Sequence, residues 1–548
     1  MKLCAKGPQF WLAAAFLVGC GGPGNSEGTD PESQCPSDLG PVQPVSGGLS
    51  SSTSWDGRYL VEGDLGITGQ LEIAPCTVVE VDPGVEITVQ DGGSIRSMGA
   101  QSREVVFTSS KAGPGAGDWA GFEIYATASN NNRLQYTTVE YGGDDQYGAI
   151  WLESNATLEL ANVTIRGTTD NGLDFVNGAN LKEANNLRFD DIGYYPIRIG
   201  AAAAGQLKNV TVEAADNERI WVRSGTLEDD AQWSNLSVPY ELYDLTIRSE
   251  LSVAAGTVVK VGPEVLIDVR GGDGVIKAIG TSDEQIVFES AKSSPAAGDW
   301  KRFDIYGDTN NTSEFRHVTL RHGSVDDHGM LWLGNGATVA LSDVQIEDGD
   351  DMGIDVVNGA TFAAFENVSL KNMGYYPIRI GAEAVGQITS VSASGGENDA
   401  VWVRPSRIES NTTWSALSIP YEIGDFTVDN GATWTVKDAA HLRMASGAEI
   451  SIEGGSKLMM QGTSTNPITV EGTSEQSGHW ASLSIYQGNS ADIAYTTIRH
   501  GGSDDRYGAI WAAGNVTLDH VTFENNSCDL DEAGGTITET SSPYTACE

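Results

Sequence analysis

The sequence predicts an all-β protein folded as one elongated parallel β-helix, with two full internal repeats of about 181 residues and a truncated third. Three observations predict this fold. Long segments recur at a fixed interval, short strand-like segments recur every 23 or 24 residues inside a copy, and no segment keeps a helical periodicity. Without the repeats, a length of 548 residues would indicate three or four separate domains.

The long repeat is visible in several motifs. GYYPIRIG occurs at 193–200 and returns 181 residues later, at 374–381. A Gly-Asp-Trp or Gly-His-Trp motif marks all three copies, at 117–119, 298–300 and 478–480. A tryptophan also stands at the start of each copy: Trp55, Trp233 and Trp414. We therefore divide the coil into the copies 55–232, 233–413 and 414–527.

A shorter period inside each copy indicates strands and tight turns. In the first copy, strand-like strings place an inward apolar residue every 23 or 24 positions, at Ile150, Leu173, Ile197 and Ile220. Asparagines between the strings keep the same spacing, at Asn162, Asn186 and Asn209. Short β-branched strings separated by Gly, Asn and Asp are typical of strands joined by turns. The asparagines are expected to form a ladder of amide hydrogen bonds from one turn to the next.

This pattern, over residues 55–527, resembles the right-handed, pectin-lyase-like β-helix superfamily. The resemblance implies a right-handed parallel β-helix in which each strand stacks on the equivalent strand of the next turn. At about 4.8 Å per turn, roughly twenty turns would give a rod about 95 Å long. The superfamily includes lyases, hydrolases, adhesins and inert scaffolds, so the resemblance implies a fold and leaves the function open.

The first twenty residues are typical of an export signal. Two lysines precede an apolar core that is too short for a permanent membrane-spanning helix. The core ends in LVGC at 17–20, which resembles a bacterial lipobox. The resemblance implies a cleaved signal peptide, 1–19, and lipidation of Cys20, with a flexible tether over 20–34. We therefore expect a lipoprotein of the bacterial outer membrane, on the cell surface or the periplasmic face.

Four further cysteines lie near the two ends of the coil: Cys35, Cys76, Cys528 and Cys547. An even number of cysteines in an exported protein favours disulfides, although four thiols allow three pairings. We predict that Cys528 pairs with Cys547 in a C-terminal cap, 528–548. Pairing of Cys35 with Cys76 would pin an N-terminal cap region, 35–54.

The charge balance excludes one class of partner. The chain has 32 Lys and Arg against 75 Asp and Glu, a formal net charge of −43. Such an acidic protein does not bind nucleic acid through charge. No Cys-x-x-Cys motif or Cys/His cluster occurs, so zinc is not expected. The expected partners of a monomer are the membrane, through the lipid on Cys20, and a polysaccharide.

Alternation along the strands predicts a column of outward side chains in each copy. In the first copy the column is Glu123, Trp151, Asp174, Arg198 and Trp221. The second copy repeats it as Asp304, Trp332, Asp355, Arg379 and Trp402, and the third keeps Ser484 and Trp511. Sugar rings stack on indole rings, and their hydroxyls bind carboxylate and guanidinium groups. The columns therefore predict a glycan-binding or adhesive scaffold.

Two other functions stay open. A polysaccharide lyase or glycoside hydrolase would use Asp174 with Arg198, or Asp355 with Arg379, as a base and a cation. The GHG and RIK motifs of polygalacturonase-like members and the WxDH motif of pectate lyases are absent, and each candidate pair occurs twice. A passive structural envelope protein is the third possibility, with the tryptophans covered by turns and the Asp–Arg pairs joining neighbouring strands.

Acidic pairs in the turns before each column suggest calcium as the one candidate cofactor. They are Asp144 with Asp145, Asp326 with Asp327, and Asp504 with Asp505. Carboxylates stacked one turn apart could bind Ca²⁺ together with backbone carbonyls. No EF-hand loop or calcium-binding nonapeptide is present, and a solvated acidic edge is the simpler interpretation.

Overall fold

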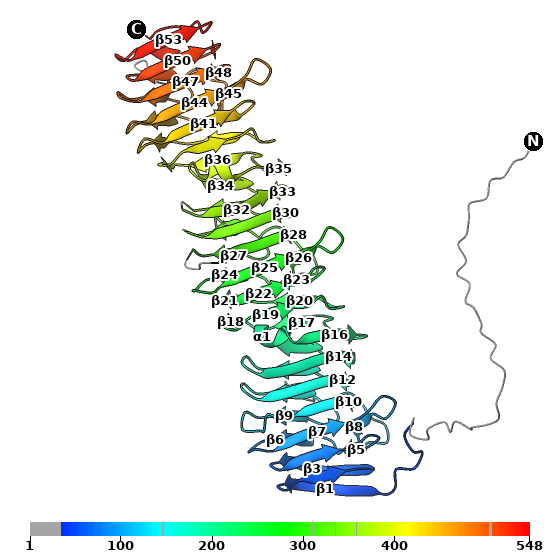
Figure 1. The fold of residues 1–548 in the computed structure, drawn as a ribbon. Coiled ribbons are helices and arrows are strands. Elements are labelled where there is room, and N and C mark those ends of the chain that lie inside the picture. Colours follow the sequence, from blue (N-terminus) through cyan, green and yellow to red (C-terminus); the bar gives the residue numbers. More distant parts are fainter. Residues whose placement is uncertain are drawn as a thin grey trace, which may run out of the picture.

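The computed structural model describes residues 34–144, 147–307, 311–334, 336–357, 359–503 and 507–547. They form a right-handed parallel β-helix of about 20 turns, drawn out into a long rod (Figure 1). In this described part the only helices are α1 (Ala201–Ala204) and η1 (Val385–Gln387). The predicted fold class is therefore confirmed.

The chain visits three faces in every turn, and parallel strands stack along each face. Face 1 includes β6 (Glu86–Val89), β9 (Gly121–Ile124), β11 (Ile150–Leu152), β13 (Leu173–Phe175), β15 (Ile197–Ile199), β17 (Ile220–Val222), β20 (Tyr240–Leu242), β23 (Val258–Val261) and β26 (Ile286–Ser290).

Face 2 is a separate sheet that includes β18 (Gly225–Leu227), β21 (Leu245–Ile247), β24 (Leu266–Val269), β27 (Arg302–Ile305), β29 (Gly329–Leu333), β31 (Met352–Val356), β34 (Ile378–Gly381) and β36 (Val401–Arg404). A further separate sheet, which we call face 3, begins in chain order between β36 and β38 (Thr412–Trp414); it is formed by β37 (Ser406–Ile408), β40 (Phe426–Val428), β43 (Glu449–Ile452), β46 (Ser482–Ile485), β49 (Ile510–Ala512) and β52 (Leu530–Asp531).

The core is one apolar column inside the coil. The residues Ile150, Leu173, Ile197 and Ile220 are each 0% exposed, as the 23-residue spacing predicts. Bulky aromatic residues fill the start of each copy, where Trp233 stacks on Tyr240 with ring centroids 4.9 Å apart. Because the inward side chains of each turn pack on those of the next, a charge introduced there would lie in an apolar environment without a partner.

The asparagine ladder lies at the bends between faces. Asn162, Asn186 and Asn209 all have positive φ, between 51° and 57°, which asparagine tolerates better than most residues. Asn186 Nδ2 donates to Asn162 Oδ1 at 2.7 Å, one turn away. Asn209 instead donates to Asn185 at 2.9 Å, so the ladder shifts by one position at the next turn. These residues therefore fix the bend and join successive turns.

One copy of the repeat takes seven whole turns. In one stack the chain steps from β7 (Ser94–Met98) to the equivalent β25 (Val275–Ile279) through β10 (Arg133–Glu140), β12 (Thr157–Thr168), β14 (Asn180–Ile192), β16 (Leu207–Val212), β19 (Ala231–Trp233) and β22 (Glu250–Val253). The equivalent residues Glu123 and Asp304 nevertheless lie in different sheets, on β9 and β27. The reason is that a new sheet begins with β18, between face 1 and this stack.

Equivalent elements of the copies lie on the same side of the rod. In Figure 1, β6 and β9 lie at the left edge of the first copy, and their equivalents β24 and β27 lie at the left edge of the second. On the right, β8 (Val105–Ser109), β26 and β45 (Ile468–Gly472) occupy equivalent places in the three copies (Figure 1). A copy of seven whole turns returns equivalent elements to the same side of the rod.

Disulfides join Cys35 to Cys76 and Cys528 to Cys547, as predicted. The coil extends into both segments expected to be caps. At the N-terminal end, β1 (Val42–Leu49) already stacks on β3 (Arg58–Ile67), and the last strand is β53 (Thr536–Thr540). The signal peptide, Cys20 and most of the tether lie outside the described residues.

Candidate functional site

The predicted outward residues of the first copy stack in register on face 1. Trp151 pairs with Glu123 on one side and with Asp174 on the other. Arg198 and then Trp221 follow in the next two turns. We call these five residues column 1. Their inward neighbours on the same strands are buried, so the alternation places the column on the outer surface.

The other copies carry equivalent columns on other sheets. Column 2 lies on face 2 and stacks Asp304, Trp332, Asp355, Arg379 and Trp402. Column 3 lies on face 3, where Ser484 pairs with Trp511. Since one copy takes seven whole turns, the equivalent columns of the three sheets fall on one side of the rod.

The carboxylate of column 1 lies beneath two arginines. Arg198 binds both oxygens of Asp174, with Nε 2.9 Å from Oδ1. Arg223, from the following turn, binds the same Oδ1 and donates from Nε to the carbonyl oxygen of Phe175 at 2.9 Å. The Asp174 side chain is 0% exposed. We call Asp174 with its two guanidinium groups the arginine clamp of copy 1.

Copy 2 has the same clamp. Arg379 binds both oxygens of Asp355, at 3.0 Å from Nε and 2.6 Å from Nη2, and Arg404 binds Oδ1 from the next turn. Arg379 also donates to the carbonyl oxygen of Asp327 at 2.6 Å. The Asp355 side chain is 1% exposed.

The clamps correct one expectation. Asp174 and Asp355 point outward from the pleat as alternation requires, but they are not surface carboxylates. Each is covered by arginines that use both of its oxygens, so neither presents a lone pair to a bound molecule. Alternation along a strand specifies the side of the sheet, and it carries no information on which longer side chains from neighbouring turns cover a short one.

The clamps keep their positive charges. Burial opposes the charged form of Arg198, but hydrogen bonding and attraction to Asp174 outweigh it and raise its pKa. Arg379 behaves in the same way beside Asp355. For Arg404, burial dominates and the neighbouring Arg379 adds repulsion, so its pKa is lowered. Each clamp combines two guanidinium groups with one carboxylate and tightly joins three successive turns.

Each tryptophan of the columns is half-buried and packs against tyrosines or a histidine, which gives five aromatic clusters. Cluster 1 is Tyr125, Tyr147 and Trp151; cluster 2 is Tyr194, Tyr195, Trp221 and Tyr243; cluster 3 is Tyr306, His328 and Trp332; cluster 4 is Tyr375, Tyr376 and Trp402; cluster 5 is Tyr486, Tyr507 and Trp511.

The packing fixes the indole rings without covering them. In cluster 1, the centroids of Tyr125 and Tyr147 lie 5.6 and 5.7 Å from that of Trp151. In cluster 2, the guanidinium carbon of Arg198 lies 5.4 Å from the centroid of the Trp221 ring. Arg379 lies 5.7 Å from that of Trp402 in the same way. The clamps thus also support the tryptophans of clusters 2 and 4 through cation–π contacts.

The exposed tyrosines are the part of the site that sequence analysis missed. Among the described residues, six large hydrophobic side chains are exposed, and five of them belong to the clusters. They are Tyr147, Tyr194, Tyr375, Tyr486 and Tyr507, at 36–44% exposure. A signal was present, since Tyr147 and Tyr507 end the recurring DDxY string and Tyr194 and Tyr375 begin YYPIRIG.

The tyrosine hydroxyls stay protonated and can donate hydrogen bonds. In cluster 2, burial together with the nearby carboxylate of Glu241 raises the pKa of Tyr243 to about 12. The Tyr243 hydroxyl donates to Glu241 at 3.0 Å. In cluster 1, a hydrogen bond to Glu123, with burial, raises the pKa of Tyr125. Phenol groups of this kind suit hydroxyl-rich ligands.

The acidic turns lie only partly within the residues that the structure describes. Asp145, Asp504 and Asp505 lie outside them. Within the described ranges, no group of three or more Asp, Glu, His or Cys side chains is placed to hold a metal ion. Asp327 accepts hydrogen bonds from Arg379 through its carbonyl and carboxylate oxygens. Calcium binding at these turns stays a prediction.

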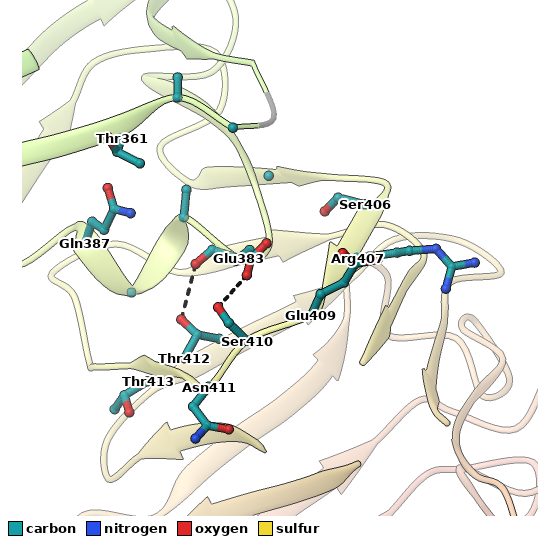
Figure 2. Close-up of a pocket in the computed structure, with 15 residues that line it drawn as sticks. Thr361, Glu383, Gln387, Ser406, Arg407, Glu409, Ser410, Asn411, Thr412 and Thr413 are labelled. Atoms are coloured by element: carbon teal, nitrogen blue, oxygen red, sulfur yellow. Dashed lines mark hydrogen bonds between the residues drawn. The ribbon is translucent and has the colours of Figure 1, made fainter. Parts of the chain in front are cut away.

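A hollow lies away from the columns. It has a volume of about 870 Å³ and forms beside β37, where η1 lies between β32 (Thr361–Glu366) and β38 (Figure 2). Figure 2 shows a polar lining, in which Thr412 Oγ1 donates to the carbonyl oxygen of Glu383 at 3.3 Å. No aromatic residue and no column residue lines this hollow.

Comparison with known proteins agrees with the fold. Residues 49–181 match the family model described as a pectate-lyase-like β-helix domain, and the described chain continues as a right-handed parallel β-helix beyond them. No curated protein and no solved structure matches the chain. In the described part of the chain, no helix has the length and apolar character needed to cross a membrane.

Proposed function

We propose that this protein is a glycan-binding β-helix scaffold that presents aromatic clusters 1–5 as stacking platforms for sugar rings. The observation that carries this proposal is the exposure of tyrosine rings beside the recurring column tryptophans. Five of the six exposed large hydrophobic side chains in the described residues lie in these clusters, each beside a half-buried tryptophan.

The clusters have the chemistry that a sugar requires. The apolar face of a pyranose packs on an indole or phenol ring, and such contacts contribute about 0.5–1.5 kcal/mol beyond the buried area. Neighbouring phenol and guanidinium groups supply hydrogen bonds to hydroxyls. In cluster 4 the Tyr376 and Trp402 rings stack at an interplanar angle of 22°, so the surface is already ordered before a ligand binds.

Binding is favoured over cleavage because the candidate catalytic carboxylates are engaged. A general base needs a free oxygen within hydrogen-bond reach of the substrate. Asp174 and Asp355 use both oxygens on arginines and are 0% and 1% exposed. The aromatic clusters, in contrast, reach the surface in all three copies.

Retention on immobilised polysaccharides tests the proposal. A panel of neutral and acidic polysaccharides is tested by affinity electrophoresis with the full chain, and the released chain ends are assayed in parallel. We expect retention without new chain ends. Trp151→Ala with Trp221→Ala should weaken retention, and adding Trp332→Ala with Trp402→Ala should remove most of it.

Tyr136→Ala is the matched control, because this half-buried tyrosine lies within β10 (Arg133–Glu140), outside every cluster. It should leave retention unchanged. If no polysaccharide is retained and a soluble quencher does not reach the tryptophans, a passive structural role replaces the proposal. If chain ends are released and Asp174→Asn with Asp355→Asn abolishes the release, the protein is an enzyme.

The proposed place of action is the bacterial outer membrane, through a lipid on Cys20, which supports display of the rod on the cell surface or in the periplasm. LVGC at 17–20 and the Gly-rich tether after it support this part of the proposal. Cys20→Ser should release the protein from the membrane fraction. If the variant stays in that fraction with unchanged mass, the anchor is of another kind.

A further inference from the structure

We infer that the five clusters act together and bind one extended, uncharged polysaccharide chain lying along the rod. This inference rests on the proposed function and adds the ligand class and its orientation. It follows from three features of the molecule: the common side of the columns, their axial spacing and the charges around them.

The spacing of the clusters follows from the turns. Trp151 and Trp221 are three turns apart on face 1, which is about 14 Å at the usual spacing of stacked strands. One copy advances seven turns, about 34 Å. The clusters therefore extend over about 70 Å from Trp151 to Trp511.

The clusters form a line because each copy takes seven whole turns. Equivalent strands such as β9 and β27 therefore lie at the same edge of the rod (Figure 1). This arrangement favours a ligand that is straight and longer than one copy.

The turn spacing also suits a linear glycan. Successive turns lie about 4.8 Å apart, close to the length of one sugar unit in an extended β-linked chain. A chain parallel to the rod axis would therefore stay roughly in step with the turns. Between Trp151 and Trp221, it would pass over the arginine clamp, where the guanidinium groups of Arg198 and Arg223 are partly exposed at 20% and 24%.

Charge selects against acidic glycans. The chain has a formal net charge of −43. Carboxylates surround the end clusters, with Glu86, Glu123 and Glu153 near Tyr125, and Glu449 and Glu453 near Tyr486. Each clamp pairs two guanidinium groups with one carboxylate and so leaves a single excess positive charge among these carboxylates. A polyuronate would be repelled along most of this side, whereas an uncharged chain would not.

Length-dependent affinity tests the inference. The full chain is titrated calorimetrically with neutral β-1,4-linked glucan, mannan and xylan oligomers of increasing length, with polygalacturonate oligomers as the charged series. We expect affinity to rise when an oligomer reaches a second cluster, at about 14 Å, and again when it spans two copies, at about 50 Å. The total gain should be on the order of a hundredfold, with one long oligomer bound per protein.

Variants of the middle copy make the test specific. Trp332→Ala with Trp402→Ala should remove most of the gain for long oligomers while short oligomers still bind at the remaining clusters. Tyr136→Ala should change neither. The inference is overturned if affinity is independent of length beyond one cluster, if several long oligomers bind per protein, or if polygalacturonate binds as well as the neutral series. Absence of binding by every glycan would instead refute the proposed function itself.

Discussion

Copies 2 and 3 of the repeat differ in how the column ends. In copy 2, Trp332 is followed by Asp355, Arg379 and Trp402, so an arginine clamp separates two aromatic clusters. In copy 3, Trp511 pairs in register with Asp531 on β52, which is the last strand of its sheet. Copy 3 therefore keeps one aromatic cluster and has no clamp.

This difference separates two roles within the column. Cluster 5 is complete without a clamp, since Tyr486 and Tyr507 pack on Trp511 at 5.0 and 6.1 Å. The clamp occurs only where the coil continues through three further turns. We conclude that the clamp stabilises the stacking of turns, and that the aromatic cluster is the feature common to all copies.

The largest expected effect concerns the clamp. Asp355→Ala would leave the guanidinium groups of Arg379 and Arg404 without their carboxylate, and breaking a buried ion pair costs about 3–5 kcal/mol. The equivalent change in copy 3, Asp531→Ala, should cost little because this carboxylate lies on the last strand of the sheet. Urea unfolding of both variants measures the difference. Equal losses would show that the clamp contributes nothing particular to copy 2.

The next effect concerns the C-terminal end of copy 3, where a disulfide stands after the last turn. Cys528 and Cys547 are 19 residues apart, and closing such a loop contributes about 3 kcal/mol in the chain-entropy account. Cys528→Ala with Cys547→Ala should therefore lower the free energy of unfolding by about this amount. Hydrogen exchange should increase first in β52 and β53. Unchanged protection of these strands in the variant would contradict the role of the disulfide.

A smaller effect separates tryptophans with and without a nearby clamp. Trp402 lies beneath Arg379, whereas Trp511 has tyrosine neighbours. Trp402→Ala and Trp511→Ala should each weaken glycan binding by about 0.5–1.5 kcal/mol. Trp402→Ala should also lower the unfolding temperature, since Arg379 loses its aromatic contact. Calorimetric titration and thermal unfolding of the same two variants give both quantities.

The smallest effect is a difference in acid sensitivity between copies. Copy 1 has Tyr141 at the position where copies 2 and 3 have His322 and His500. Burial, together with the adjacent arginine, lowers the pKa of both histidines below 6.5, against the weaker attraction of nearby carboxylates such as Asp348 and Glu471.

The direction in which the free energy of unfolding changes with pH follows from proton linkage. Below pH 6.5 the unfolded chain binds protons at these histidines before the folded chain does, so the free energy of unfolding falls as the pH decreases. His322→Tyr, which copies the residue of copy 1, should flatten this dependence between pH 7 and pH 5. Unfolding temperatures across this range test it. A dependence equal to that of the parent chain would assign the acid sensitivity to other groups.

The fold could be predicted from sequence because its determinants are local. The inward positions Ile150, Leu173 and Ile197 recur with the length of a turn, and alternation then specifies the outward partners. The disulfides were also predictable, since the four cysteines stand near the two ends of the coil. Each of these inferences needs only the order of residues within one turn.

The candidate site was predicted only in part. The order of Trp151, Asp174 and Arg198 in the column follows from alternation, but burial of Asp174 depends on Arg223, which comes from a turn beyond the column pair. The tyrosines stand in turns, where period-two alternation carries no information. Their exposure could be known only after the turns were placed beside the strands. The binding role of the column stays a prediction.

The length of the repeat has a consequence for how this molecule can grow. Because one copy takes seven whole turns, duplication of a 181-residue unit lengthens the aromatic line and keeps the later clusters on the same side of the rod. Each added unit brings its own tryptophans and tyrosines, so the number of clusters grows with the length of the rod. Insertion of a single turn would move the later clusters about 4.8 Å along the rod without adding one.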